Sequence, residues 1–226
     1  MITKRLEGLD RLDLTKVIKK KNPYLFRAKN YDNASDVVKD LMDAYISSSE
    51  EAKFGDWLEG LAIHVNSIVY GGTKSSSQGI DLDFQKNDTR YLVAIKSGPN
   101  WGNSSQINKM IQDFQLAKKV LRTSGANVHV EFVNGCCYGR SSRTLQRGIY
   151  YKYCGQMFWE FISGDSQLYL EIIEPLAQEA KARSISYQTK HSNTLNKLTK
   201  DFILKFCDEQ GCIDWETLVR LNSSYE

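Results

Sequence analysis

The sequence is poor in the features that mark fibrous, secreted and membrane proteins. Its 226 residues include only 3 prolines and 15 glycines, which excludes a collagen-like or low-complexity chain. No apolar run approaches the roughly 20 residues that span a bilayer, and residues 1–7 lack the apolar segment of a secretory signal. We therefore expect a cytoplasmic protein, built as one large domain or two small ones.

Cysteine and histidine are too few and too scattered to indicate a zinc site. The 5 cysteines include no C-x-x-C pair, and the 3 histidines lie far apart along the chain. We expect the thiols to be reduced and mostly structural.

Acidic residues are missing from three long stretches that carry basic ones. Residues 89–112, 132–159 and 180–200 contain lysine or arginine and no aspartate or glutamate, although the net charge is only +3. Such stretches favour contact with a polyanion, DNA or RNA, through its phosphates. For each stretch, a solvated loop or helix face stays open as the alternative.

Hydrophobic periodicity predicts helices and strands. A period of 3.6 residues indicates a helix, and a period of two indicates a strand. The predicted helices are residues 35–47, 51–69, about 104–125, 155–162, 168–182, 194–207 and 215–221, and the predicted strands are residues 80–84, 91–96 and 128–133. Three serines at residues 47–49 are expected to separate the first two helices, and Pro175 to kink or break the fifth. The pattern predicts an α/β fold with helical additions.

The first two predicted strands bring charged side chains to one face of a small sheet. If residues 87–88 form a two-residue turn, Asp83 faces Leu92 in the neighbouring strand, and Lys96 lies diagonally from Asp81. Carboxylates this close repel unless a cation lies between them, and Mg²⁺ prefers oxygen ligands. A lysine beside such a site can position a water or help it lose its proton. The group indicates metal-assisted hydrolysis of a phosphodiester, with a solvated edge strand as the alternative.

Three sequence stretches carry a resemblance to a known family. They are GIDLDF at residues 79–84, AIKSGPN at residues 94–100 and GQMFWEFISG at residues 155–164. With these motifs, residues 54–175 resemble the PD-(D/E)XK nucleases and, more narrowly, type II restriction endonucleases, including members that cut at rare sites. The resemblance implies a small mixed sheet flanked by helices, here with additional C-terminal helices.

The resemblance implies a role for each residue of the strand motif. Asp81 matches the metal-binding aspartate, Lys96 matches the catalytic lysine, and the backbone carbonyl of Ile95 matches a frequent metal ligand. The implied cofactor is Mg²⁺, and Ca²⁺ is expected to bind without supporting cleavage. The implied product carries a 5′-phosphate.

Ala94 departs from the family pattern because it stands where the second acid should be. Its side chain cannot bind a metal. We expect Asp83 and Glu59 to supply the missing carboxylate, with Glu59 slightly favoured because it resembles a helix glutamate that often joins this site. The departure keeps a second hypothesis open, that of a DNA-binding protein that has lost catalysis.

Polar side chains in two of the acid-free stretches are candidates for reading DNA. Asparagine, glutamine and arginine form bidentate hydrogen bonds to base edges in the major groove. The candidates are Asn100, Trp101, Asn103, Ser104, Ser105, Gln106, Arg140, Arg143 and Arg147. A palindromic site reflects a two-fold protein, so we expect a homodimer on double-stranded DNA.

Taken together, these patterns predict one nuclease-like domain over residues 1–226. We expect an N-terminal helical part at residues 1–50, a catalytic core at residues 51–135, and a DNA-contact and helical part at residues 136–226. The leading hypothesis is a Mg²⁺-dependent type II restriction endonuclease, whose host would need a cognate DNA methyltransferase. A structure-specific or repair nuclease of the same fold is the alternative within the enzymes.

Overall fold

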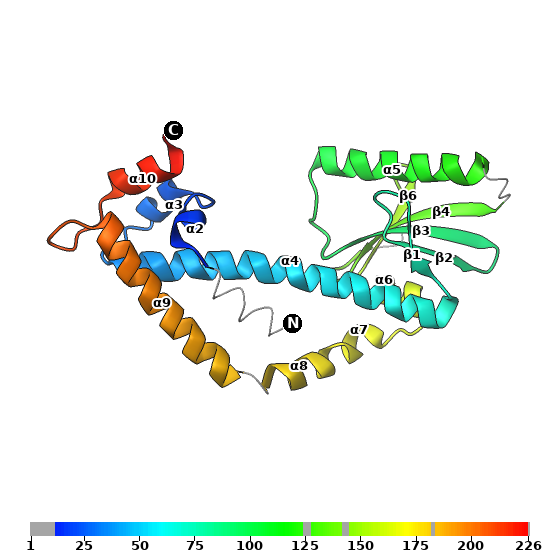
Figure 1. Ribbon diagram of the computed structural model, residues 1–226. Helices are drawn as coiled ribbons and strands as arrows, with labels where there is room; N and C mark the ends of the chain where they lie inside the picture. The colour runs from blue at the N-terminus through cyan, green and yellow to red at the C-terminus, as the bar shows by residue number, and fades with distance from the viewer. Residues whose placement is uncertain (1–11, 124–127, 142–144, 182–183, 226) are drawn as a thin grey trace. The chain divides into compact units, whose positions relative to one another are not determined.

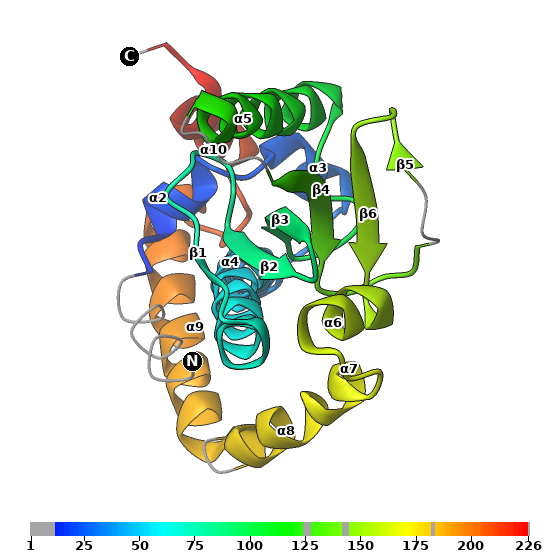
Figure 2. The ribbon, with the colours of Figure 1, turned by 90° about the vertical axis from the view of Figure 1, so that its right-hand side faces the viewer.

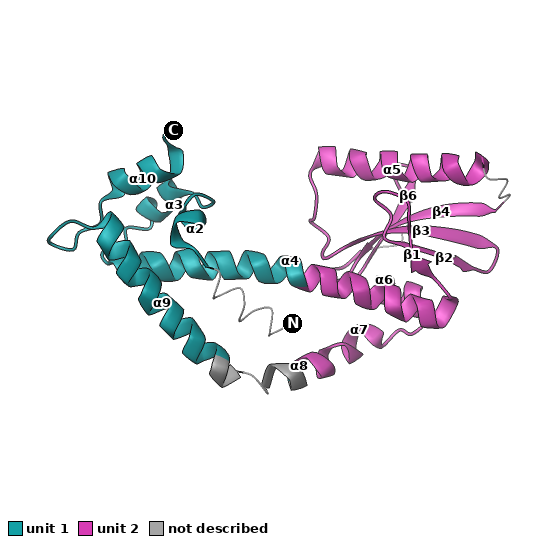
Figure 3. Cartoon of the chain, in the orientation of Figure 1, with its two compact units in different colours: residues 1–53, 177–226 teal, residues 54–176 magenta. Residues whose placement is uncertain are grey.

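The structure, a computed structural model, describes residues 12–123, 128–141, 145–181 and 184–225. Its contacts divide the chain into two compact units, shown in Figure 3. We call residues 54–176 the sheet unit, and residues 1–53 with 177–226 the helical unit. Each unit has its own hydrophobic core. The single domain over residues 1–226 that the sequence led us to expect stays a prediction.

A six-stranded mixed sheet forms the centre of the sheet unit. Its strands are β1 (Thr73–Lys74), β2 (Leu82–Lys86), β3 (Thr89–Lys96), β4 (His129–Cys136), β5 (Leu145–Gln146) and β6 (Tyr150–Cys154), in the spatial order β1-β2-β3-β4-β6-β5. Strands β3, β4 and β6 run parallel, and the other neighbours pair antiparallel. The carboxyl ends of the three parallel strands therefore meet at one edge, the usual place for a ligand site in such sheets.

Helices cover both faces of this sheet, as Figure 2 shows. Helix α5 (Ser104–Thr123) packs on the face that carries Ala94. The second half of helix α4 (Ala34–Tyr70) and helix α6 (Gln156–Ser163) pack on the face that carries Val93. The mixed sheet between helix layers is the architecture expected from the sequence.

The β2–β3 hairpin has the predicted register. Asp83 pairs with Leu92, and residues 87–88 form the turn, with Asn87 in the left-handed region at φ 54°. The strand start differs from the prediction, because the ladder begins at Leu82 and the N–H of Asp81 donates to the carbonyl of Val93. The alternation of faces is interrupted there.

Two predicted helix breaks are wrong. Residues 47–49 lie inside α4, which runs unbroken through 37 residues. The Ser48 hydroxyl donates to the Ala44 carbonyl one turn earlier, which lets the helix accommodate a serine. In the C-terminal half, the break falls at Ile172, between α7 (Leu168–Glu171) and α8 (Ile173–Lys181). Pro175 lies in the first turn of α8, where a missing N–H is tolerated.

The helical unit packs short N-terminal helices against the C-terminal ones. Its elements besides the first half of α4 are α2 (Leu14–Ile18), α3 (Pro23–Ala28), α9 (Ser184–Phe206) and α10 (Trp215–Ser223), visible in Figure 1. Asp214 caps α10, with its carboxylate accepting the N–H of Thr217. Among the described residues, no helix is long and apolar enough to cross a membrane.

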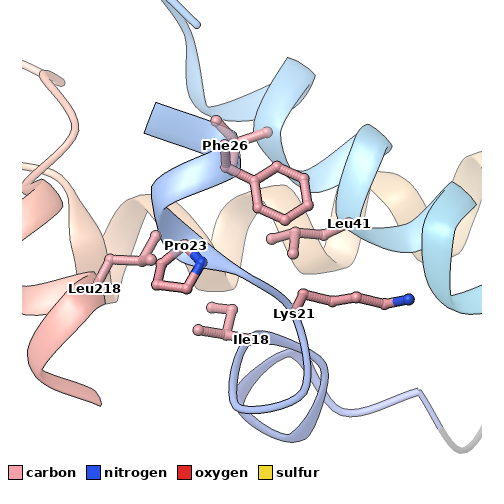
Figure 4. A pocket seen from close by; sticks show the side chains of 7 residues that line it. Ile18, Lys21, Pro23, Phe26, Leu41 and Leu218 are labelled. Atoms are coloured by element: carbon pink, nitrogen blue, oxygen red, sulfur yellow. The ribbon is translucent and has the colours of Figure 1, made fainter. Parts of the chain in front are cut away.

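A buried apolar cluster and a partly exposed ion pair contribute to the helical unit. Figure 4 shows the small apolar pocket of about 10 Å³ that remains where Ile18, Phe26 and Leu218 meet. Nearby in this unit, the carboxylate of Asp40 accepts hydrogen bonds from the Lys29 ammonium and from a tyrosine hydroxyl. These two donors lower the pKa of Asp40, with the lysine first.

Candidate active site

Asp81 and Lys96 meet at the carboxyl end of β3. The Oδ2 atom of Asp81 accepts the backbone N–H of Ile95 at 2.7 Å and lies 3.6 Å from the Nζ atom of Lys96. That ammonium also donates to the carbonyl of Ile95 at 2.9 Å. The side chains of Lys96 and Asp81 are 30% and 22% exposed, so the group is partly shielded and still open to solvent. The structure thus brings together the three predicted positions.

The irregular start of β2 explains how Asp81 reaches this place. Because its own N–H donates to Val93, Asp81 stands just outside the ladder, and its carboxylate can accept the N–H of Ile95.

Asp113 on α5, which the sequence reasoning missed, packs behind the turn that precedes Asp81. A Cβ atom on Gly79 would lie 2.5 Å from the Oδ2 atom of Asp113, so only glycine fits there. The sequence signal that could have revealed Asp113 was an acidic residue within the apolar stripe of this helix.

The oxygens around the Lys96 ammonium suit a hard cation. Asp81 Oδ2 and the Ile95 carbonyl oxygen already hold a positive group between them. Mg²⁺ takes oxygen ligands of these two kinds and keeps several waters. The donor set therefore fits Mg²⁺, with Asp81 and Ile95 as the residues that would hold it.

A tryptophan and a buried asparagine hold Lys96 from the other side. The Nζ atom of Lys96 lies 5.4 Å from the centre of the Trp101 ring. The indole N–H of Trp101 donates to Asn134 Oδ1 at 3.0 Å, and the Asn134 amide donates to the Ala94 carbonyl at 3.2 Å. Asn134 is 1% exposed. This chain of contacts ties the lysine to the core of the sheet, and Asn134 has no sequence signal that would have revealed it.

The two candidates for the missing carboxylate lie in different surroundings. Asp83 accepts both hydrogen bonds of a bidentate pair with Arg90, at 2.8 and 2.7 Å, and this contact raises the pKa of Arg90. Glu59 on α4 has a looser partner, the ammonium of Lys74 at 3.4 Å, which is largely exposed. In the described part of the chain, no three His, Cys, Asp or Glu side chains converge into a metal-binding group. Glu59, Asp83 and Asp81 therefore do not form a three-carboxylate cluster.

Loops after the three parallel strands are joined next to Lys96. The N–H of Cys137 donates to the carbonyl of Lys96 at 3.0 Å, and the N–H of Tyr138 donates to that of Ser97 at 3.2 Å. The N–H of Gly155 donates to the carbonyl of Cys136 at 3.0 Å. The stretch after β4 thus links two of the three motifs that carried the family resemblance, those at residues 94–100 and 155–164. We did not single out this linking role from the sequence.

The thiols around this junction are buried, which raises their pKa values. Burial, and secondarily the nearby charge of Glu59, raise the pKa of Cys137 to about 12. Burial likewise raises the pKa of Cys136. All five cysteines are free, as expected, and Cys212 is exposed.

Several predicted DNA-contact residues have structural partners. Asn103 and Gln106 form a reciprocal cap at the start of α5, each side-chain oxygen accepting the other's backbone N–H, at 3.1 and 2.9 Å. Asn103 is therefore the N-cap of α5. Those two serines and Asn100 are exposed.

The three predicted arginines fall in different situations. Arg140 is exposed on the loop after β4. The guanidinium of Arg147 donates to Asn108 Oδ1 at 2.6 Å. Arg143 lies outside the described residues. Trp101 is also among the DNA-contact residues predicted from the sequence, but its indole N–H donates to Asn134 within the protein.

A mixed sheet flanked by helices, with an aspartate and a lysine at the end of a central strand, defines a PD-(D/E)XK-like nuclease core. The sequence model of the family described as Type II restriction endonuclease EcoO109I matches residues 1–184 of the 226. This chain therefore belongs to the EcoO109I family of type II restriction endonucleases, which confirms the wider resemblance found in the sequence. No curated protein matches the chain.

Proposed function

We propose that this restriction endonuclease is Mg²⁺-dependent and hydrolyses both strands of duplex DNA at a short palindromic site. The single observation that carries the proposal is the convergence of Asp81 Oδ2, the Ile95 carbonyl and the Lys96 ammonium at the end of β3. Family membership supports the substrate class.

Each residue of this group has a proposed task. Asp81 and the Ile95 carbonyl would hold Mg²⁺, which when bound supplies positive charge to the phosphate oxygens and the leaving oxygen. Lys96 orients the attacking water through a hydrogen bond as the ammonium, or accepts the proton of the water as the neutral amine. Trp101 holds the Lys96 ammonium over its ring, which keeps it near Asp81 and the Ile95 carbonyl. The expected product carries a 5′-phosphate.

We propose Glu59 ahead of Asp83 as the second carboxylate. Asp83 would have to give up a bidentate arginine pair, in which both oxygens accept hydrogen bonds. Glu59 would give up one contact at 3.4 Å to an exposed lysine, which costs about 0–1 kcal/mol. Leaving its present partner therefore costs Glu59 less than it costs Asp83.

The finer features of the proposal concern partners and specificity. A palindromic site calls for a homodimer, and the host would protect its own DNA with a cognate methyltransferase. We place the protein in the cytoplasm, where it would meet DNA. A specificity like that of SwaI or PmeI is a narrower proposal, which rests on motif order and chain length alone.

Cleavage of a fully sequenced, unmethylated viral DNA with Mg²⁺ tests the function. The controls are EDTA, Lys96→Ala, and Lys119→Ala, which removes an exposed lysine of α5. Discrete fragments that need Mg²⁺ and Lys96 support a site-specific endonuclease. A smear that ignores sequence would instead favour a structure-specific or repair nuclease.

One observation favours a second function, that of a catalytically inactive DNA-binding protein. Ala94 is fully buried under α5 and supplies no second carboxylate, and among the described residues no three His, Cys, Asp or Glu side chains converge into a metal-binding group. A Ca²⁺ titration by calorimetry separates the two functions. Heat of binding that Asp81→Asn abolishes supports the nuclease, and duplex binding without any Ca²⁺ site supports the inactive binder.

A further inference from the structure

A second site lies beside the catalytic group, at the carboxyl ends of β4 and β6. It is an open pocket of about 620 Å³ within the sheet unit. Its walls are the loop at residues 137–141, residues 154–157 at the start of α6, and the side chains of Trp159 and Tyr169. This volume falls within the roughly 300–1,000 Å³ of small-ligand pockets.

The lining has the chemistry of an anion site with aromatic walls. Among the described residues its lining has no acidic side chain, and Arg140 is its one basic side chain. Arg140 is exposed. Tyr138, which is 60% exposed, and Tyr169 add aromatic surface, and Gln156 adds an exposed amide. Guanidinium groups bind phosphate, and aromatic rings pack against bases or sugars.

The loop that carries Arg140 is tied down at both ends. The Ser141 hydroxyl accepts the N–H of Cys154 at 2.9 Å and donates to the carbonyl of Lys152 at 3.2 Å. Gly139, at φ 100°, packs on the ring of Pro99. The backbone around the arginine is therefore held before any ligand arrives, which reduces the entropy lost on binding.

The same loop adjoins the proposed active site. The N–H of Tyr138 donates to the carbonyl of Ser97, one residue after Lys96. A Cβ atom on Gly98 would lie 2.2 Å from the Tyr138 ring, so the ring rests directly on the Gly98 backbone. Tyr138 thus forms the wall between the catalytic group and the pocket.

We propose that this pocket binds the sugar-phosphate backbone of a DNA strand next to the scissile phosphate, with Arg140 on the phosphate. The inference rests on the proposed function, because it takes Lys96 and Asp81 to mark the scissile position. The pocket then holds one neighbouring nucleotide of the same strand and sets the register of the strand across the catalytic group.

The salt dependence of duplex binding tests the phosphate contact. Affinities are measured in Ca²⁺ on the duplex that carries the mapped cleavage site, and on a random 30-base-pair duplex if no site is found. We expect Arg140→Ala to weaken binding about 10-fold near 0.1 M salt and to reduce the slope of log affinity against log salt by about 0.9. Arg122→Ala, at an exposed arginine of α5, is the matched control and keeps both values.

A second measurement locates the contacted phosphate. Methylphosphonate substitutions remove the charge of one phosphate at a time near the cut. We expect one neutral position to weaken wild-type binding and to have no effect on Arg140→Ala, while Arg140→Lys keeps part of the effect. An unchanged salt slope in Arg140→Ala, or a scan with no position that depends on Arg140, would overturn the proposal. Absence of site-specific cleavage would overturn the proposed function and the placement of the pocket next to a scissile phosphate, whereas the salt slope on the random duplex would still show whether Arg140 contacts a phosphate.

Discussion

Replacing Asn134 by alanine should disturb both the stability and the chemistry of the sheet unit. The buried amide accepts the indole N–H of Trp101 at 3.0 Å and donates to the Ala94 carbonyl at 3.2 Å. Trp101 in turn faces the Lys96 ammonium. Asn134→Ala removes both hydrogen bonds and releases the tryptophan that keeps the lysine in place.

The contacts set the size of the effect. Two neutral hydrogen bonds are worth about 1 kcal/mol each, and a half-buried indole N–H left without an acceptor adds about 1–2 kcal/mol. We therefore expect Asn134→Ala to lower the free energy of unfolding by about 2–4 kcal/mol. The cation–π contact is worth about 0.5–2 kcal/mol, so a loosened Trp101 should slow single-turnover cleavage about 2- to 30-fold.

Val133→Ala is the matched control, because Val133 is buried in the same strand but faces the opposite core. It should cost about 2 kcal/mol of stability and leave the cleavage rate unchanged. Urea unfolding followed by circular dichroism gives the stabilities, and single-turnover cleavage well below the unfolding midpoint gives the rates. A fully active but destabilised Asn134→Ala would refute the link to Lys96, and an undestabilised one would refute the hydrogen-bond reasoning.

Three further predictions concern other parts of the chain. Gly155→Ala should destabilise by about 2–5 kcal/mol, since its φ is 55° and the new Cβ would lie 2.3 Å from a backbone oxygen, whereas Gly148→Ala, at φ 66° with open space around it, should cost about 1 kcal/mol in urea unfolding. Iodoacetamide at pH 8 should label exposed Cys212 in the native protein and spare Cys137, and rapid labelling of Cys137 by mass spectrometry would contradict its buried, raised pKa. Asp40, whose pKa is lowered, stabilises the fold above its ordinary pKa of about 4 and stops doing so as the pH falls through the lowered value. Asp40→Asn should thus be less stable than wild type at pH 7 and converge with it in acid, and a gap that persists in acid would argue against the charge.

Local pattern was sufficient for the hairpin and for the position of the lysine. Alternating residues and a turn at residues 87–88 specify the pairing of β2 with β3, because a one-residue slip would turn every side chain to the wrong face. The same register places Lys96 and Asp81 near one another. The period of α5 was likewise readable from residues 104–123, since its apolar stripe is continuous.

Local pattern failed where a distant partner decides the conformation. The three serines in α4 look like a helix break, but serine lowers helix propensity only slightly, and the flanking apolar residues of the helix pack on both sides of them. Asp81 leaves the strand ladder because its carboxylate can bond the N–H of Ile95, 14 residues later. A one-dimensional pattern carries no record of that bond.

The sequence by itself determined the class of chemistry. Its aspartate and lysine lie on either side of a hairpin turn, at spacings that place both at one edge of the sheet. Their short separation along the chain makes their meeting a matter of local geometry. Tertiary structure alone decided what surrounds them: Asn134 behind Trp101, and a loop from β4 that joins two distant motifs. These contacts join elements up to tens of residues apart, and only the packing of parallel strands side by side brings them into reach.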